Sequence, residues 1–177
     1  MARRFRIFLW VATITLALDQ LSKWLARARL DFGRPHEVIA GFFDLRLSYN
    51  TGSAFGLFAK LGGARVLLSV VGLAACVAIV LILRKAHDAQ RWLATALALV
   101  AGGAVGNVID RVLAGKVTDF IVWKYGKHEW PAFNIADAAL VAGVLIMFFD
   151  VGRDSKKKAP APAETGKAAG KEPKRRG

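Results

Sequence analysis

The sequence has few residues of the kinds that support covalent or metal-dependent catalysis. Cys76 is the only cysteine, so the chain can form no internal disulfide and offers no cysteine spacing of a metal site. The three histidines have no partnered nucleophile, and His128-Glu129 is not followed by the second histidine of an H-E-x-x-H zinc motif, because Ala132 stands there. We therefore expect no metal, no cofactor and no covalent intermediate.

Acidic residues are also scarce, numbering 13 against 26 Lys and Arg, and the net charge is +13. Much of the basic excess lies in residues 153–177, which are rich in Lys, Ala, Pro and Gly and have no apolar periodicity. We expect this segment to be a disordered cytoplasmic tail beside anionic lipid. Nucleic-acid binding is the less favoured interpretation of the same charge.

Charged residues are rare within four long apolar blocks, at about residues 7–28, 66–83, 92–110 and 132–150. Each block is close to the ~20 residues that a helix needs to cross a bilayer. We predict four transmembrane helices in one membrane domain, residues 1–152. The first block follows three arginines, as a secretory signal does, but it has no small-x-small cleavage site before Asp19, so a retained anchor is favoured. The basic termini and basic second loop place both termini in the cytoplasm.

Two segments between the blocks have the pattern of strands. Residues 43–50 alternate apolar and polar side chains, and residues 117–125 form a second short strand before a turn at Gly126. The expected fold is therefore a membrane all-α bundle of four helices with a small amphipathic β-sheet and loop region outside it. Asn50 and Gly52 follow the first strand, within a run of small residues that extends to Gly56. Small residues around an Asn permit close approach of a peptide backbone, although a simple turn explains them too.

Charged residues within the first block are spaced for pairing. Asp19 and Lys23 are four residues apart on one helical face, with the acid on the N-terminal side, which favours an ion pair. A structural pair is favoured over catalysis. Ser22 and Lys23 point in different directions, which argues against a Ser/Lys nucleophile.

The third block ends in a group of small and polar residues. Gly102 and Gly106 have the G-x-x-x-G spacing that lets another helix pack closely. Asn107 and Asp110 share a face, and Arg111 follows directly and can satisfy the charge of Asp110. We expect these three polar residues to support a site rather than to react.

Two further acids, Asp119 and Asp137, lie where apolar segments meet water. An ionisable group in a span costs at least ~2.5 kcal/mol, so Asp137 at the start of the fourth block is a candidate functional residue. Asn134 precedes it by three residues, on the same helical face. Two adjacent carboxylates can share one proton, so that one activates water while the other donates to a carbonyl oxygen. The sequence leaves open which of the two is protonated.

Together these motifs resemble bacterial lipoprotein signal peptidase, also called signal peptidase II. The resemblance rests on Asp19-Gln-x-Ser-Lys23, Asn50-x-Gly52-x-Ala54-Phe55, Gly102-Gly-Ala-x-Gly106-Asn107-x-x-Asp110-Arg111, Val117-x-Asp119-Phe120 and Phe133-Asn134-x-Ala136-Asp137, in this order along the four blocks. It implies an aspartic endopeptidase at the periplasmic face of the bacterial inner membrane. Such an enzyme removes the signal peptide of a prolipoprotein just before its diacylglyceryl-modified cysteine.

The resemblance also assigns roles to residues. It implies that Asp119 and Asp137 are the catalytic dyad, and that the residues which contact the peptide or support the dyad are Asn50, Gly52, Asn107, Arg111 and Asn134. It further implies inhibition by the cyclic peptide globomycin and contact with membrane lipids. We expect a monomer that binds no nucleic acid.

A rival interpretation is an ion or proton conductor lined by Asp19, Asp110 and Asp137. It is disfavoured, because a conductor needs carboxylates spread through the depth of the membrane, whereas these cluster toward one face. A purely structural membrane protein does not account for Asp119 and Asp137.

Overall fold

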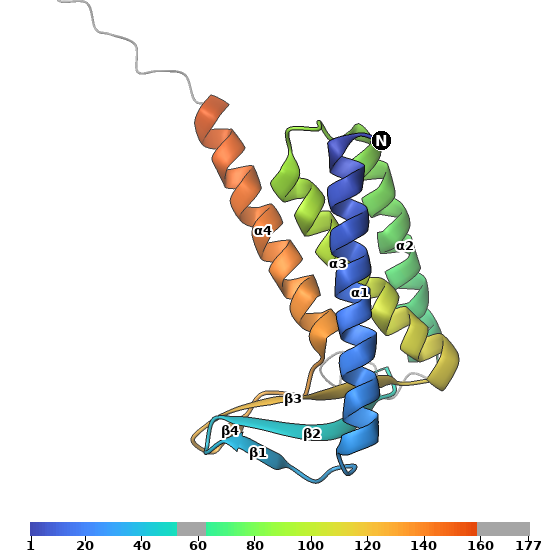
Figure 1. Ribbon diagram of the computed structural model, residues 1–177, viewed down its shortest axis with the longest axis vertical. Coiled ribbons are helices and arrows are strands. Elements are labelled where there is room, and N and C mark those ends of the chain that lie inside the picture. Colours follow the sequence, from blue (N-terminus) through green and yellow to red (C-terminus); the bar gives the residue numbers. More distant parts are fainter. Residues whose placement is uncertain (53–62, 159–177) are drawn as a thin grey trace, which may run out of the picture.

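The computed structural model describes residues 1–52 and 63–158, in which long helices stand on a small sheet (Figure 1). The predicted mostly helical fold with a small β element is confirmed. The helices are α1 Arg3–Arg29, α2 Ala64–Lys85, α3 Arg91–Ala114 and α4 Ile135–Lys158; the strands are β1 His36–Ile39, β2 Phe43–Asn50, β3 Val117–Tyr125 and β4 His128–Glu129.

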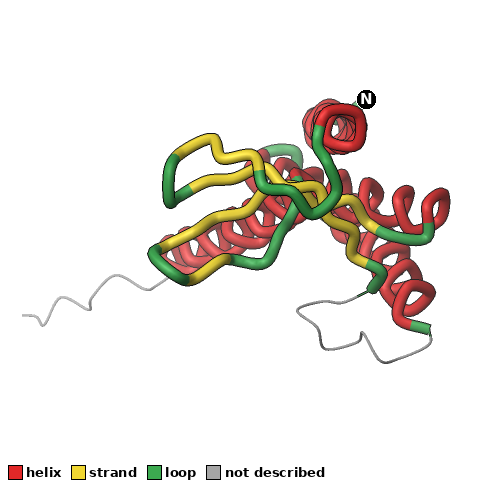
Figure 2. The backbone as a smooth tube through the Cα atoms, turned by 90° about the horizontal axis from the view of Figure 1, so that it is seen from below, coloured by secondary structure: helices red, strands yellow, loops and turns green. Residues whose placement is uncertain are grey.

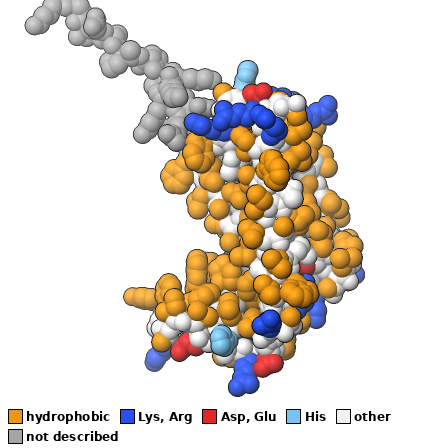
Figure 3. Space-filling view, in the orientation of Figure 1, with side chains coloured by type: hydrophobic (Ala, Val, Ile, Leu, Met, Phe, Trp, Pro, Cys, Tyr) orange, Lys and Arg blue, Asp and Glu red, His pale blue; other side chains and the backbone are white. Residues whose placement is uncertain are grey.

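Helices α1, α2 and α3 are long and apolar enough to cross a membrane. Along α2 the buried residues are Ala64, Ile79 and Leu83, and most of its other apolar side chains face outward. Such a surface is stable against lipid hydrocarbon but not in water. Figure 3 shows hydrophobic side chains covering the middle of the molecule, with charged side chains gathered at its two ends. The chain is therefore a multi-pass membrane protein.

Helix α3 lies at the centre and packs against α1, α2 and α4. Glycines permit this close contact. A Cβ at Gly102 would lie 2.9 Å from the carbonyl oxygen of Ala12 in α1, and one at Gly106 would collide with the Asp19 carboxylate. Gly103, on another face, packs directly against the backbone of Ala136 in α4. The small residues of α3 thus fix its distance from two helices at once.

The sheet lies at the end of the bundle where α1 finishes and α4 begins, beside the last turns of α1 (Figures 1 and 2). Its antiparallel strands follow the order β1-β2-β3-β4. The predicted strands at residues 43–50 and 117–125 are confirmed as β2 and β3, whereas β1 and β4 were not predicted. Both unpredicted strands are short and exposed, so they carry little of the apolar alternation by which a strand is recognised.

The predicted apolar face of β2 is wrong in part. A register irregularity between Leu45 and Ser48 interrupts the alternation, and the buried residues of the strand are Asp44 and Leu47. Leu47 packs in a core cluster with Ala26 and Phe120. Asp44 is paired with Lys124 of β3, and this hydrogen bond raises the pKa of the lysine. The ion pair explains why Asp44 can be buried, although the alternating pattern of β2 predicted that its polar side chains face outward.

Helix α4 begins at Ile135 rather than at residue 132 as predicted, because Phe133 is engaged in backbone pairing with Ile121 of β3. It also continues past residue 150, to Lys158. The rest of the predicted tail, and Ala54, Phe55 and Gly56 of the motif after Asn50, lie outside the described residues.

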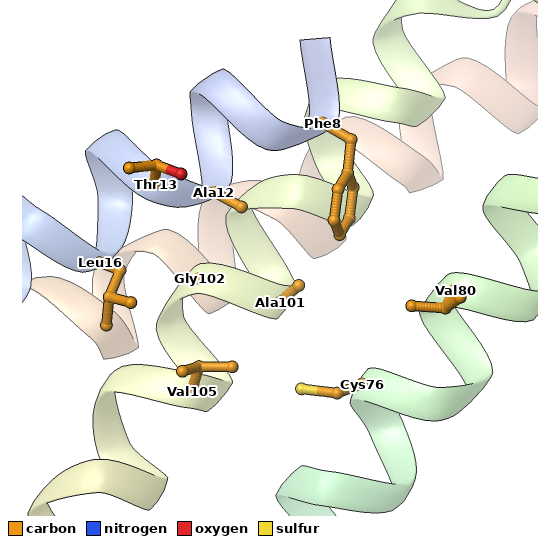
Figure 4. A pocket seen from close by; sticks show the side chains of 9 residues that line it. All are labelled: Phe8, Ala12, Thr13, Leu16, Cys76, Val80, Ala101, Gly102 and Val105. Carbon is orange, nitrogen blue, oxygen red and sulfur yellow. The ribbon is translucent and has the colours of Figure 1, made fainter. Parts of the chain in front are cut away.

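A cavity of about 270 Å³ lies between α1, α2 and α3 (Figure 4). Its lining is apolar, with Phe8, Cys76 and Val80 pointing into it. None of its described lining residues is a carboxylate or an amide, so the cavity does not contain the acids of the sequence motifs. The polar side chains gather instead at the sheet end of the bundle.

Candidate active site

Backbone hydrogen bonds tie the start of α4 to strand β3. The amides of Phe120 and Ile121 donate to the carbonyl oxygen of Phe133 at 3.0 and 2.9 Å, and the amide of Phe133 donates back to Ile121 at 3.0 Å. This pairing makes Asp119, directly before Phe120, a neighbour of Asn134, directly after Phe133.

Asn134 and Asp137 form a capping box at the N-terminus of α4. Asn134 Oδ1 accepts from the amide of Asp137 at 3.0 Å, and Asp137 Oδ2 accepts from the amide of Asn134 at 3.3 Å. Asn is a strong N-cap residue, and the reciprocal bond from the third helical position completes the motif. A carboxylate in the first turn also interacts favourably with the helix dipole. The local sequence thus fixes the Asp137 side chain against its own helix end.

Asparagine side chains link the two acids. Asn134 Nδ2 donates to Asp119 Oδ1 at 2.6 Å and to Asn107 Oδ1 at 3.3 Å. Asn107 Nδ2 donates in turn to Asp137 Oδ1 at 2.8 Å. Asp119 is only 3% exposed and Asn134 is fully buried, so water does not compete for these bonds. Both carboxylates lie within one hydrogen bond of Asn134.

The pKa of Asp119 is raised to about 7, chiefly by burial and next by the negative charge of Asp137. The hydrogen bond from Asn134, the charge of Lys23 and a hydrogen bond with Asn50 act in the opposite direction. A carboxyl group with a pKa near neutrality can either hold or release a proton under physiological conditions. This is the property that acid–base chemistry on a peptide bond requires.

Asn50, the last residue of β2, hydrogen-bonds with Asp119 and also holds the turn that follows the strand. Asn50 Oδ1 accepts from the amide of Gly52 at 3.0 Å, which is an Asx-type turn. Gly52 has φ +128°, and a Cβ there would lie 2.9 Å from the Ala64 side chain. Only glycine adopts this conformation without strain. Ser48, which is the pairing partner of Asp119 in the sheet, donates from its Oγ to the backbone oxygen of Asp119 at 3.2 Å.

A family model described as "Signal peptidase (SPase) II" matches residues 11–153 of this chain. The chain belongs to the signal peptidase II family. It is 44% identical over 144 residues to a lipoprotein signal peptidase of Paraburkholderia phymatum, covering 81% of this chain and 86% of that one. It is 40% identical over 156 residues to that of Aeromonas hydrophila, covering 88% and 93%. A solved bacterial membrane enzyme superposes with a TM-score of 0.76 at 31% identity, covering 89% and 94%. The protein is accordingly a peptidase, as the resemblance predicted.

The residues matching the family motifs lie together in the structure. From α1, Lys23 Nζ donates to Asp19 Oδ2 and to Asn107 Oδ1, each at 2.9 Å, and lies 3.4 Å from Asp110 Oδ2. Asp19 and Lys23 are both fully buried. The predicted ion pair is therefore present, and it is joined to the polar residues of α3. Ser22 instead donates to the backbone of Asp19 and takes no part.

Arg111 lies at the edge of this group. Its Nη1 donates weakly to the backbone oxygen of Asn107 at 3.4 Å, and its charge interacts with Asp110, Asp119 and Asp137. Its buried Nε has no hydrogen-bond partner among the described residues. Arg111 thus carries positive charge and an unused donor beside the two acids.

Sequence reasoning missed three contacts that complete the family site. Asp19 Oδ1 accepts from the amide of Ala136 at 2.9 Å, which holds the first turn of α4 against α1. Asp110 Oδ2 accepts from the amide of Thr118 at 3.0 Å, and Arg27 Nη1 donates to Thr118 Oγ1 at 2.9 Å. The N-x-x-D spacing of Asn134 and Asp137 could have identified the capping box. The three long-range contacts, in contrast, cannot be recognised from any short stretch of the sequence.

No group of three potential metal ligands occurs among the described residues. Asp19, Asp110 and Asp137 meet at one end of the bundle, where Lys23 or Asn107 contacts each of them. They do not form a path through the membrane depth, which removes the basis of the conductor interpretation.

Proposed function

We propose that the protein is an aspartic endopeptidase which removes signal peptides from diacylglyceryl-modified prolipoproteins, cutting just before the lipidated cysteine. Family membership supports the substrate class. The aspartic mechanism rests on a single observation, the bridge from Asn134 to Asp119 and, through the capping box, to Asp137.

In the proposed mechanism Asp119 holds the proton and Asp137 is ionised. With a pKa of about 7, Asp119 carries a proton in about half of the molecules at neutral pH, so the protonated form is available. Asp137 accepts hydrogen bonds from Asn107 and from the amide of Asn134 at the positive end of α4, which stabilises its carboxylate. Asp137 then takes a proton from water as the water oxygen attacks the scissile carbonyl carbon, and Asp119 donates to the carbonyl oxygen. The tetrahedral intermediate then collapses with cleavage of the C–N bond: Asp137 passes the proton taken from water to the leaving amine, and Asp119 takes a proton back from the hydroxyl group as the carbonyl re-forms.

The supporting residues have distinct parts in this proposal. Asn134 and Asn107 fix both carboxylates, and Asn50 holds Asp119 while the turn at Gly52 leaves space for a peptide backbone. Arg111, whose Nε has no hydrogen-bond partner within residues 1–52 and 63–158, interacts with the developing negative charge or with a substrate carbonyl. Asp110 fixes the start of β3 through Thr118.

The proposal includes a topology. Helix α4 is the fourth span, residues 1–152 form the membrane unit, and residues 153–177 are a basic cytoplasmic tail. Arg3, Arg4, Arg6, Arg84 and Lys85 lie at the end of the bundle opposite the sheet. The positive-inside rule supports cytoplasmic termini, with the sheet and the site at the periplasmic face of the inner membrane. Substrate enters laterally from the bilayer, its lipid chains remain in the membrane, and the enzyme acts as a monomer.

The test uses purified protein in detergent with a diacylated prolipoprotein, and compares wild type with Asp119→Asn and Asp137→Asn. Both variants should fold yet lose cleavage by at least about a hundredfold, because acid–base groups contribute about 10²–10⁴-fold each. Asp88→Asn, at an exposed acid beside Arg4 at the opposite end, is the matched control and should cleave as wild type does. Cleavage near the wild-type rate by either site variant excludes that residue from the dyad. Inhibition by globomycin is expected in the same assay.

A further inference from the structure

Lys23 lies in an environment where an unpaired charge would be strongly destabilising. Its side chain is fully buried, and its ammonium contacts Asp19, Asp110 and Asn107. A structural role as the partner of Asp19 accounts for one of these contacts only. The hydrogen bond to Asn107 instead connects Lys23 to the proposed dyad, because Asn107 itself donates to Asp137. Lys23 is thus one side chain removed from the proposed dyad.

The charges around the dyad do not balance if every acid is ionised. The charged groups that face it come from each element packed there: Asp19, Lys23 and Arg27 from α1, Asp110 and Arg111 from α3, Asp119 from β3 and Asp137 from α4. Among the residues that the structure describes, four carboxylates therefore meet three cations. In a site shielded from water an excess charge is costly, and a bound proton is the simplest way to remove it. One proton on the dyad makes the cluster neutral.

We propose that Lys23 is a positioning residue for the reaction, whose buried ammonium sets the number of protons on the Asp119–Asp137 pair to one. This inference rests on the aspartic mechanism proposed above. With Lys23 present, the pair keeps one ionised and one protonated acid, as water attack requires. Without this cation, a second proton enters the cluster more readily, and the base is lost.

The direction of the effect follows from the same charges. Removing a cation stabilises the protonated forms of the acids, so both limbs of the pH–rate profile move to higher pH. Removing the Asp19 carboxylate does the opposite. An opposite charge within about 4–6 Å typically shifts such a titration by about 1–3 units, and Lys23, which is one side chain from the dyad, should act at the lower end of that range. Two variants of one ion pair should therefore shift the profile in opposite directions, which a purely structural role for the pair does not predict.

The test measures kcat against pH with a diacylated lipopeptide that carries a fluorophore and a quencher. Lys23→Met should move both limbs upward by about one unit, and Asp19→Asn should move them downward, while its oxygen still accepts from the amide of Ala136. The double variant restores the charge balance, so its limbs should return to within about half a unit of wild type. Arg4→Gln, at the opposite end of the bundle, is the control and should shift neither limb.

Arg27→Gln keeps the inference testable if Lys23→Met fails to fold. Arg27 lies at the rim, 3.9 Å from Asp110 and about a third exposed, so its replacement should be tolerated and should give a smaller upward shift. Single variants that fold and lose kcat with unshifted limbs, or that shift in the same direction, overturn the inference. So does an unshifted Arg27→Gln profile. If instead Asp119→Asn or Asp137→Asn remains active, the proposed dyad itself has failed, and the two failures are therefore distinguishable.

Discussion

Replacing Asn134 by Ala should be among the most damaging changes outside the acids themselves. Its side chain caps α4 by accepting from the amide of Asp137 and donates at 2.6 Å to Asp119, and it is fully buried. Loss of an N-cap costs ~1 kcal/mol. Above pH 7, where Asp119 is ionised, loss of its buried hydrogen bond costs a further ~1.5–3 kcal/mol. We therefore expect Asn134→Ala to lower the free energy of unfolding by about 2.5–4 kcal/mol.

Asn134→Ser separates the two contributions. Serine is also a good N-cap, so its oxygen can still accept from the amide of Asp137, but it has no amide group to donate to Asp119. The serine variant should recover ~1 kcal/mol of the loss seen with alanine. In both variants the pKa of Asp119 rises, because the hydrogen bond from Asn134 holds it down. The basic limb of the cleavage profile then moves to higher pH.

The assays are denaturant unfolding in detergent micelles and the pH dependence of lipopeptide cleavage. An alanine variant that loses less than ~0.5 kcal/mol would refute the capping-box assignment, since surface changes fall in that range. Equal stability of the serine and alanine variants would mean that the cap contributes nothing. An unshifted profile would mean that Asn134 does not hydrogen-bond to Asp119 in the working enzyme.

Two further predictions concern stability. The folded protein binds the Asp119 proton more tightly than the unfolded chain does, so this residue stabilises the fold below its ordinary pKa of 3.8, and that stabilisation is lost as pH rises to about 7. The difference in unfolding free energy between wild type and Asp119→Asn should fall across this window, whereas parallel curves would contradict the raised pKa. Gly106→Ala should destabilise by ~1–3 kcal/mol by displacing the Asp19 carboxylate, while Gly63→Ala, where a Cβ meets no atom of the described residues within 4 Å, should be nearly neutral, as measured by denaturant unfolding.

Much of this protein follows from local sequence. Apolar runs of the length of a bilayer define the positions of the helices, because each helix satisfies its own backbone and its side chains only need to match lipid. The strands β2 and β3 follow from alternation and from the turns beside them. The polar residues of the site could be selected for the same reason, since a carboxylate such as Asp137 beside an apolar span is costly unless it has a use.

Contacts between distant segments were not available to this reasoning. The burial of Asp44 and Leu47 depends on an irregular register between β2 and β3, which no pattern in β2 alone encodes. Helix α4 starts three residues later than predicted, because Phe133 pairs with a strand rather than continuing the helix. Tertiary pairing outcompeted the local apolar signal in each case.

The sequence by itself determined the four helices and the two longer strands, which side chains are polar inside an apolar chain, and the family to which they belong. Only the tertiary structure decided how those side chains meet: Asn134 between Asp119 and Asp137, and Lys23 between Asp19 and Asn107. The physical reason is the distance along the chain over which each kind of interaction acts. Helix and strand patterns reflect neighbours within a few residues, whereas the site depends on β3 pairing with the start of α4 and on glycines that let α1 and α4 approach α3.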